Sequence, residues 1–307
     1  MNRLKVIYIM GAGRSGSTVL DTVLGGHPEI ESVGELVNAS KAFSNPFEYC
    51  ACGERAGDCP FWAKVRDEWK KLSGYKDISE LAELQHHYER VRRLPYLYLS
   101  RLFGTAGYKR YLHAQQSLFQ AIAIVSGKGI VVESSKSPVR AFALANMLDV
   151  DFYVIHLVRD GRGVAWSLKK SYKKDPKAGV QQDLHSLPIW KTALSWAFVN
   201  MLSEMLFRNF QHSMQVFYEE FVENTDKVLN LIGDFMGVSF HGINNMINNE
   251  GKIPVGHTVA GNRLRMTGVI KLNPDYEWKK SLSELDKNSF GYIVGWLLRR
   301  YGYCRKL

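Results

Sequence analysis

Short apolar runs and amphipathic stretches alternate along the chain. The run at 4–10 is continuous and apolar, as in a strand buried on both faces of a parallel sheet. Similar short runs lie at 129–133, 152–158 and 214–217. We expect a helix after each run. Strands that alternate with helices predict a parallel sheet joined by right-handed crossovers.

The residues between the first two runs carry a long helical pattern. Proline and glycine recur over 38–60, which predicts irregular structure, whereas 61–126 is charged, periodic and rich in Leu, Tyr and Arg, as helices are. Gly, Asn and Pro also recur over 251–274, where we expect a loop. The pattern predicts a three-layer α/β fold like that of P-loop proteins: a mostly parallel central sheet flanked by helices. One domain over 1–307, with a helical insertion at about 40–126, is expected.

Two further helices are expected near the C-terminus, at 188–207 and 283–301. The first is amphipathic, and one stripe collects apolar side chains: Trp190, Leu194, Ala197, Met201 and Met205. We expect Met201 and Met205 to belong to the core.

The composition is that of a globular protein, with 46% hydrophobic and 23% charged residues in 307. The longest apolar stretches fall far short of the roughly 20 residues that cross a membrane, which argues against a transmembrane segment. Lys and Arg number 40 against 30 Asp and Glu, a balance of +10 that favours anionic partners. No nucleic-acid-binding motif accompanies this charge, so we expect a small anionic ligand and no nucleic acid.

The N-terminus and the cysteines suggest a location. The basic and apolar start at 1–10 leads into a glycine-rich loop without a small-residue cleavage site. Four cysteines in a chain of this length do not form a disulfide scaffold. A cytoplasmic protein with reduced thiols is expected.

A glycine-rich turn follows the first predicted strand. Gly11 and Gly16 have the spacing of the P-loop pattern G-x4-G-K-[ST], and Thr18 is in place. Ser17 stands where the pattern has lysine, and Arg14 lies inside the loop. Successive N–H groups at the start of a helix attract an anion, so the loop predicts an anion site without the lysine of nucleotide kinases.

Several motifs together resemble one family. The loop reads R-S-G-S-T at 14–18 and is followed by H-P at 27–28 and G-E at 34–35. The run at 152–158 is followed by an arginine and, eight residues after it, a serine. With these features the chain resembles sulfotransferases that use 3′-phosphoadenosine 5′-phosphosulfate (PAPS), in particular their carbohydrate and tyrosylprotein branches. Further matches follow in order: Lys136-Ser137-Pro138, Tyr218-Glu219 and His257-x3-Gly261-Asn262-x2-Arg265.

The resemblance implies transfer of a sulfuryl group from PAPS to an acceptor hydroxyl or amine, which leaves 3′,5′-ADP. PAPS carries a 5′-phosphosulfate and a 3′-phosphate, so two anion sites are expected. The loop would hold the first, and Arg159 with Ser167 the second. The expected PAPS-binding residues are Gly13, Arg14, Ser15, Gly16, Ser17, Thr18, Arg159, Ser167, Tyr218, Asn262 and Arg265.

Catalysis should come from positioning and from donors to the peripheral oxygens, as in phosphoryl transfer. We place Arg14 and Lys136 as the cations at the bridging oxygen and the transferred group. Glu35 is the candidate base, because its counterpart in the resembling branches lies near the acceptor. The tyrosylprotein branch has two adjacent glutamates where this chain has Glu35 and Leu36. His185 is the second candidate base.

No metal is required for this reaction. Cys50, Cys52 and Cys59 resemble a metal cluster, with Cys304 as a distant fourth cysteine. Their spacing departs from the C-x2-C pattern, so we expect packed thiols near Trp62 rather than structural zinc.

Other functions fit part of the pattern. A small-molecule kinase would use the same loop, and a non-catalytic binder of nucleotides or anionic glycans would explain the charge alone.

Within the sulfotransferase prediction the acceptor is open: a small-molecule alcohol, a carbohydrate, a glycolipid or a tyrosine. The segments at 40–126 and 175–188 are expected to shape its pocket, and the oligomeric state is not predicted.

Overall fold

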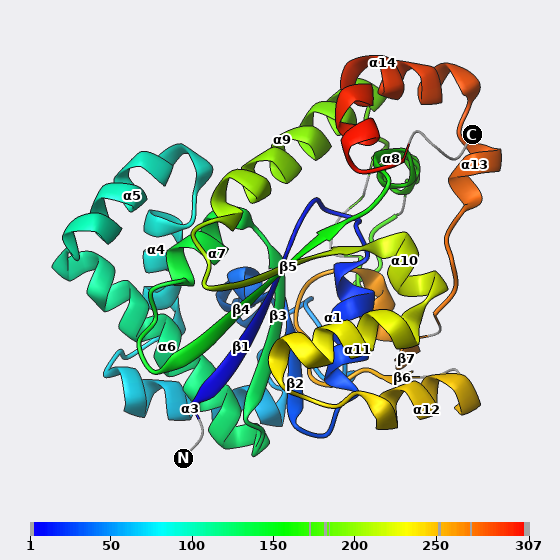
Figure 1. The fold of residues 1–307 in the computed structure, drawn as a ribbon. Coiled ribbons are helices and arrows are strands. Elements are labelled where there is room, and N and C mark those ends of the chain that lie inside the picture. The colour runs from blue at the N-terminus through cyan, green and yellow to red at the C-terminus, as the bar shows by residue number, and fades with distance from the viewer. Residues whose placement is uncertain are drawn as a thin grey trace.

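Five parallel strands form the central sheet in the order β2-β3-β1-β4-β5. They are β1 (Leu4–Met10), β2 (Ile30–Gly34), β3 (Ile130–Lys136), β4 (Val150–Val158) and β5 (His212–Phe217). The computed structural model describes residues 3–171, 173–180, 183, 185–250, 253–270 and 272–303. Figure 1 shows the strands side by side with helices around them, which confirms the predicted α/β fold.

Strand β2 is the strand that the hydrophobic pattern did not predict. Its sequence, I-E-S-V-G, mixes polar with apolar residues, yet all five residues are buried beside β3. Two predicted irregular regions also contain regular structure. Helix α2 (Ala39–Ser44) lies in the first, and a small antiparallel pair, β6 (Ile253–Pro254) with β7 (Val269–Ile270), lies in the second.

Helices fill the connection between β2 and β3, as expected for 61–126. They are α3 (Pro60–Ser73), α4 (Ile78–Tyr88), α5 (Leu94–Phe103) and α6 (Ala106–Ser126). In Figure 1 they lie together on one side of the sheet. A capping box of Asp77 and Glu80 starts α4, and the Thr105 hydroxyl accepts from the Tyr108 N–H at the start of α6.

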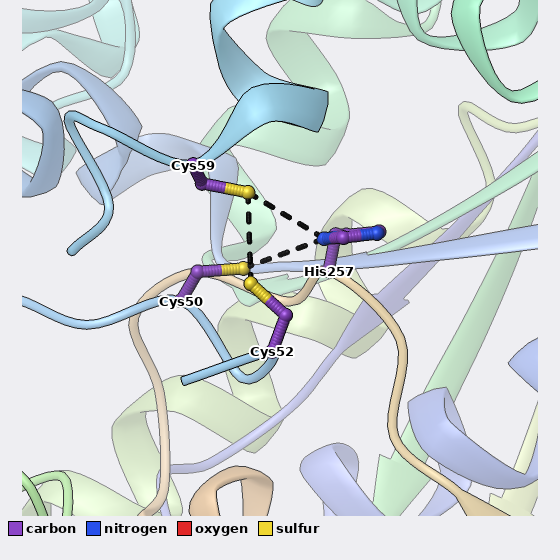
Figure 2. A group of neighbouring side chains, drawn as sticks. All are labelled: Cys50, Cys52, Cys59 and His257. Carbon is purple, nitrogen blue, oxygen red and sulfur yellow. Dashed lines mark hydrogen bonds between the residues drawn. The ribbon is translucent and has the colours of Figure 1, made fainter. Parts of the chain in front are cut away.

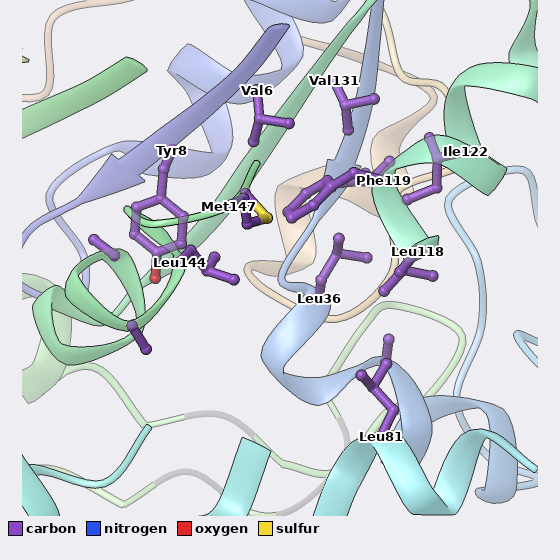
Figure 3. Packing of buried hydrophobic residues seen from close by; sticks show 14 of the residues in the cluster. Val6, Tyr8, Leu36, Leu81, Leu118, Phe119, Ile122, Val131, Leu144 and Met147 are labelled. Carbon is purple, nitrogen blue, oxygen red and sulfur yellow. The ribbon is translucent and has the colours of Figure 1, made fainter. Parts of the chain in front are cut away.

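Successive side chains of a strand point to opposite sides, so a continuous apolar strand contributes apolar side chains to both faces of the sheet. Val6 and Tyr8 of β1 face the core that includes Leu118 and Phe119 of α6 (Figure 3). Ile7 and Ile9 point to the opposite face and belong to a second core. That second core is covered by α1 (Ser17–Gly25) and α11 (Thr225–Met236).

Helix α9 (Ile189–Phe207) buries only Ala197 of the apolar stripe that its sequence predicts. Met201 and Met205 are 47% and 59% exposed, so their prediction as core residues was wrong. The adjacent face, which includes Ala193 and Trp196, is buried against α8 (Gly161–Lys169) and α14 (Glu284–Arg300). Periodicity shows that apolar residues share a face, but it does not show that another element covers that face.

The remaining helices are short. They are α7 (Pro138–Leu144), α10 (Tyr218–Glu223), α12 (His241–Glu250) and α13 (Glu277–Ser281), with 3-10 turns at Leu36–Asn38, Val91–Arg93 and Arg263–Thr267. Across the described ranges, no helix combines the length and the apolar character that crossing a membrane requires.

Candidate functional site

The predicted site residues follow the carboxyl ends of the five strands. The loop Gly11–Gly16 follows β1, Glu35 follows β2 and Lys136 ends β3. Arg159 follows β4 and Tyr218 follows β5. Since β1 lies at the centre of the sheet, the loop is flanked by Lys136 on one side and Arg159 on the other. Open parallel sheets bind ligands at this edge, where the strand order reverses.

The loop has a backbone that needs its glycines. Gly16 has φ of 90°, and a Cβ there would lie 2.3 Å from the Tyr218 ring. A Cβ on Gly11 would lie 2.3 Å from the carbonyl oxygen of Leu157. No heavy atom lies within 4 Å of the Cβ position of Gly13, so the backbone is open to a ligand there.

Polar groups of the loop suit an anion. Ser17 and Thr18 are the first residues of α1, where backbone N–H groups have no partner within a helix. The Ser15 hydroxyl is buried and accepts or donates no hydrogen bond within the described part of the chain. Together with the helix dipole, these donors suit an anionic group such as a phosphate or a sulfate.

Arg159 is held against the loop. Its Nη1 donates to the Arg14 carbonyl over 3.0 Å, and its Nη2 donates to Asp275 Oδ2 over 2.9 Å. The guanidinium lies 4.5 Å from the centre of the Tyr218 ring, and 7% of the side chain is exposed. A ligand phosphate at this position would compete with the carboxylate of Asp275 for Arg159.

The turn after β4 is fixed by buried polar groups. The Asp160 carboxylate caps α8 by accepting from the Arg162 N–H over 2.9 Å. Glu219 accepts from the Asp160 N–H and from the Tyr303 hydroxyl, and burial raises the pKa of its carboxyl. Ser167 lies farther along α8 and is half-buried.

The candidate base and one candidate cation form an ion pair. Lys136 Nζ donates to Glu35 Oε1, while Asn38 Nδ2 donates to Glu35 Oε2 over 3.1 Å. Both charged side chains are largely buried, at 15% exposed for Glu35 and 20% for Lys136. The Lys136 carbonyl accepts from the Gly11 N–H over 3.0 Å, which ties the pair to the start of the loop.

The late loop at 257–265 supports this pair from the other side. Val259 exchanges backbone hydrogen bonds with Val33 and Glu35. Asn262 caps the 3-10 turn by accepting from the Leu264 N–H. Arg265 is buried, pairs with Glu48 and donates to the Ala260 carbonyl. These contacts hold the late loop in place, and PAPS binding by Asn262 and Arg265 stays a prediction.

A buried charge network lies behind Lys136 and has no counterpart in the sequence predictions. Arg140 of α7 is fully buried and pairs with Glu133 of β3 over 2.7 Å and with Glu89 after α4. Burial raises the pKa of Glu89. The Ser137 hydroxyl caps α7, and Pro138 is the first residue of this helix. The network anchors the end of β3 to the helices of the insertion.

Asp21 is a further buried carboxyl without a counterpart in the sequence predictions. Burial in α1 raises its pKa to about 8, while the nearby Ser32 and Ser134 hydroxyls and the charge of Lys136 act in the opposite direction. The signal was present in the sequence, since a lone aspartate stands among the apolar residues of 19–24. At neutral pH this group is largely protonated.

The remaining predictions concern the cysteines and the second candidate base. Cys50, Cys52 and Cys59 do lie together, and His257 joins them, whereas Cys304 falls outside the described residues. His185 is exposed. Its loop at 175–188 includes Gln181, Gln182 and Leu184, which also fall outside the described residues.

Two solved sulfotransferase structures are similar to this chain. The structure aligns with sulfotransferase STF9 from Mycobacterium avium at a TM-score of 0.50 and 12% identity, covering 98% of this chain and 77% of that one. The alignment with the sulfotransferase domain of the olefin synthase from Synechococcus PCC 7002 has a TM-score of 0.46 and 20% identity. It covers 96% of this chain and 95% of that domain. No curated protein sequence matches significantly.

The family follows from the sequence itself. The model of the sulfotransferase family matches residues 7–242, which is well over half of the chain. This match spans the loop, Glu35, Lys136 and Arg159. The chain therefore belongs to the sulfotransferase family.

Proposed function

We propose that this chain transfers a sulfuryl group from PAPS to a hydroxyl or amine acceptor, giving a sulfate ester in the case of a hydroxyl. The observation that carries the proposal is the arrangement around the loop after β1. Arg159 contacts the loop on one side, and the Glu35–Lys136 ion pair contacts its start on the other. The loop would bind one anion. Arg159 on one side would bind a second phosphate, and Glu35 on the other side would accept a proton.

The donor side uses the loop and β4. Loop residues 13–18 would hold the 5′-phosphosulfate through backbone N–H groups and hydroxyls. Arg159 and Ser167 would hold the 3′-phosphate, since an arginine and a hydroxyl suit a dianionic phosphate. PAPS supplies an activated sulfuryl group, and its bridging oxygen leaves with 3′,5′-ADP.

The acceptor side uses β2 and β3. Glu35 would take the proton of the acceptor as the acceptor oxygen or nitrogen forms its bond to sulfur. Lys136 and Arg14 would stabilise the charge on the peripheral and bridging oxygens. For this, the Lys136 ammonium turns from Glu35 toward the sulfuryl group, which leaves the carboxylate of Glu35 available as a base.

The chain acts as one domain over 1–307, and its acceptor is a small molecule, a carbohydrate or a glycolipid. The loop sequence argues against a kinase, because Ser17 stands where a kinase needs the lysine that reaches the transferred phosphate.

The test is a transfer assay with ³⁵S-labelled PAPS over a panel of phenols, alkanols, glycans and glycolipids. A parallel reaction contains ATP with magnesium. Label that moves from PAPS to at least one acceptor class, with no phosphoryl transfer from ATP, supports the proposal. Phosphoryl transfer from ATP, or binding of 3′,5′-ADP without turnover on any class, contradicts it.

A further inference from the structure

Three cysteines and one histidine meet outside the proposed active site (Figure 2). The sulfurs of Cys52 and Cys59 are 3.7 Å apart, and His257 Nδ1 lies 3.5 Å from Cys59 Sγ and 3.8 Å from Cys50 Sγ. All four ligand atoms lie within 4.8 Å of one another. Figure 2 shows the sulfurs turned toward one another and toward the imidazole.

The three shortest of these distances are close to the edges of a zinc tetrahedron. Zn–S bonds of about 2.3 Å and Zn–N bonds of about 2.0–2.1 Å place tetrahedral sulfurs about 3.8 Å apart, and a sulfur about 3.6 Å from a nitrogen. The distances between Cys52 and Cys59 and between Cys59 and His257 are close to these values. A disulfide would need about 2.05 Å between the sulfurs. The three thiols are free.

The surroundings hold the four ligands in place. Cys50 and Cys59 are fully buried, and Cys52 lies in a turn closed by a hydrogen bond from the Gly53 N–H to the Cys50 carbonyl. Cys59 is the N-cap residue of α3, so the start of this helix fixes its backbone. The Phe61 ring stacks on His257 at 4.6 Å between centroids and 9° between planes.

We propose that Cys50, Cys52, Cys59 and His257 bind one structural zinc ion. Four protein ligands leave no coordination position for water or substrate, which is the pattern of a structural site. Three thiolates and an imidazole select zinc over magnesium or calcium, which prefer oxygen ligands. This proposal replaces the expectation that the chain holds packed thiols and no metal. Spacing alone could not predict it, because the fourth ligand comes from the late loop.

The zinc joins two segments that are far apart in the sequence. Besides the metal, the Ala51 N–H donates to the Thr258 carbonyl over 3.0 Å, and Trp62 Nε1 donates to the His257 carbonyl over 2.7 Å. His257 precedes by two residues Val259, whose backbone pairs with Glu35. Zinc therefore positions the late loop beside Glu35. This effect on catalysis rests on the proposed function, whereas zinc binding does not.

The test is the metal content of the purified full-length chain, expressed with added zinc and dialysed against metal-free buffer. We expect about one zinc per chain by mass spectrometry and, by X-ray absorption, three sulfur ligands with one nitrogen ligand. A metal-free chain with titratable thiols at all three positions overturns the proposal. A disulfide between Cys52 and Cys59 also overturns it.

Variants locate the ion. His257→Ala and Cys59→Ser should lose most of the zinc, whereas His257→Cys should retain it because four thiolates also bind zinc tetrahedrally. Cys304→Ser and His86→Ala, the latter at an exposed histidine of α4, are matched controls that should keep zinc at the wild-type level. Equal zinc in all variants would mean adventitious binding and overturn the assignment. If Cys59→Ser fails to fold, the wild-type spectrum and the zinc content of His257→Cys still test the proposal.

Discussion

Lys136 Nζ donates a hydrogen bond to Glu35 Oε1, so an ion pair joins the carboxyl ends of two adjacent strands, β3 and β2. The two residues are 101 positions apart in the sequence. The pair places a carboxylate and an ammonium together beside the anion-binding loop. In the proposed reaction the ammonium moves to the sulfuryl group and the carboxylate receives the acceptor proton.

Glu35→Gln should keep the fold and the affinity for 3′,5′-ADP but lower kcat by roughly 10²–10⁴, because an amide cannot accept the acceptor proton. Steady-state kinetics on the true acceptor measure this. Glu29→Gln, at an exposed glutamate before β2, is the matched control and should stay within about twofold of the wild type. A kcat of Glu35→Gln within about threefold of the wild type would transfer the role of base to another residue, with His185 as the first candidate.

The loss in Glu35→Gln should depend on the acceptor. A phenol with a pKa near ~10 needs less help to lose its proton than an alkanol does, so the defect should be smaller for phenols. Kinetics on a series of phenols with graded pKa values provide the measurement. A defect of the same size across the series is inconsistent with a base at Glu35.

Arg159→Ala should weaken 3′,5′-ADP binding by about 1.5–3 kcal/mol, or roughly 10- to 150-fold, because a charge-assisted hydrogen bond to the 3′-phosphate is lost. Isothermal titration calorimetry measures the dissociation constant. Asp275→Asn is the matched control, since it removes the carboxylate that pairs with Arg159 but leaves the guanidinium. It should bind 3′,5′-ADP at least as tightly as the wild type. Unchanged affinity in Arg159→Ala would show that the arginine serves only its ion pair with Asp275.

Arg140→Ala should destabilise the folded chain by about 3–5 kcal/mol, because it leaves Glu133 and Glu89 buried without their cation. Urea unfolding measures the free energy of unfolding. Arg92→Ala, at an exposed arginine in the same insertion, should change it by less than about 0.5 kcal/mol. Similar small changes in both variants would rule out a stabilising role for the buried network.

Asp21 should make stability fall as the pH rises. Its pKa is about 8 in the folded chain. It is near ~4 in an unfolded chain. The folded chain therefore binds more protons between these values, and the stabilisation present below about pH 4 is lost as the pH rises to about 8.

The Asp21→Asn variant tests this pH dependence. Its Tm, relative to the wild type, should rise from pH 5 to pH 9, because the amide cannot ionise. Asp67→Asn, at an exposed aspartate of α3, is the control and should show no such trend. Parallel pH profiles for Asp21→Asn and the wild type would mean that Asp21 does not titrate in this range.

Patterns of neighbouring residues predicted individual strands and the glycine-rich loop. Continuous apolar runs identified β1 and β4, and the glycine spacing identified the loop at 11–16. Strand β2 was missed because its burial comes from the neighbouring β3 and the layers above and below, not from its own composition. Helix α9 shows the same limit, since its more apolar stripe is the exposed one.

The site was predictable where it follows strand ends and not where it depends on long-range pairing. Arg159 and Lys136 could be placed at one edge because parallel strands end together. Lys136 pairs with Glu35, and Arg265 pairs with Glu48. Each pair joins residues that are far apart in the sequence, so neither could be predicted from local patterns. The sequence placed His257 in a motif that matches the family, and only the structure brings it to the cysteines.

The central claim is that the loop at 11–18 and Arg159 bind a donor with a 3′-phosphate. The most direct test is the Tm of the purified chain with saturating 3′,5′-ADP, with ATP and with adenosine 5′-phosphosulfate at equal concentration. A ligand at 100 times its dissociation constant stabilises the folded state by about 2.7 kcal/mol, so a specific ligand gives a clear upward shift. We predict a large increase in Tm with 3′,5′-ADP, and much smaller ones with the two compounds that lack a 3′-phosphate. Equal shifts with all three would contradict the account.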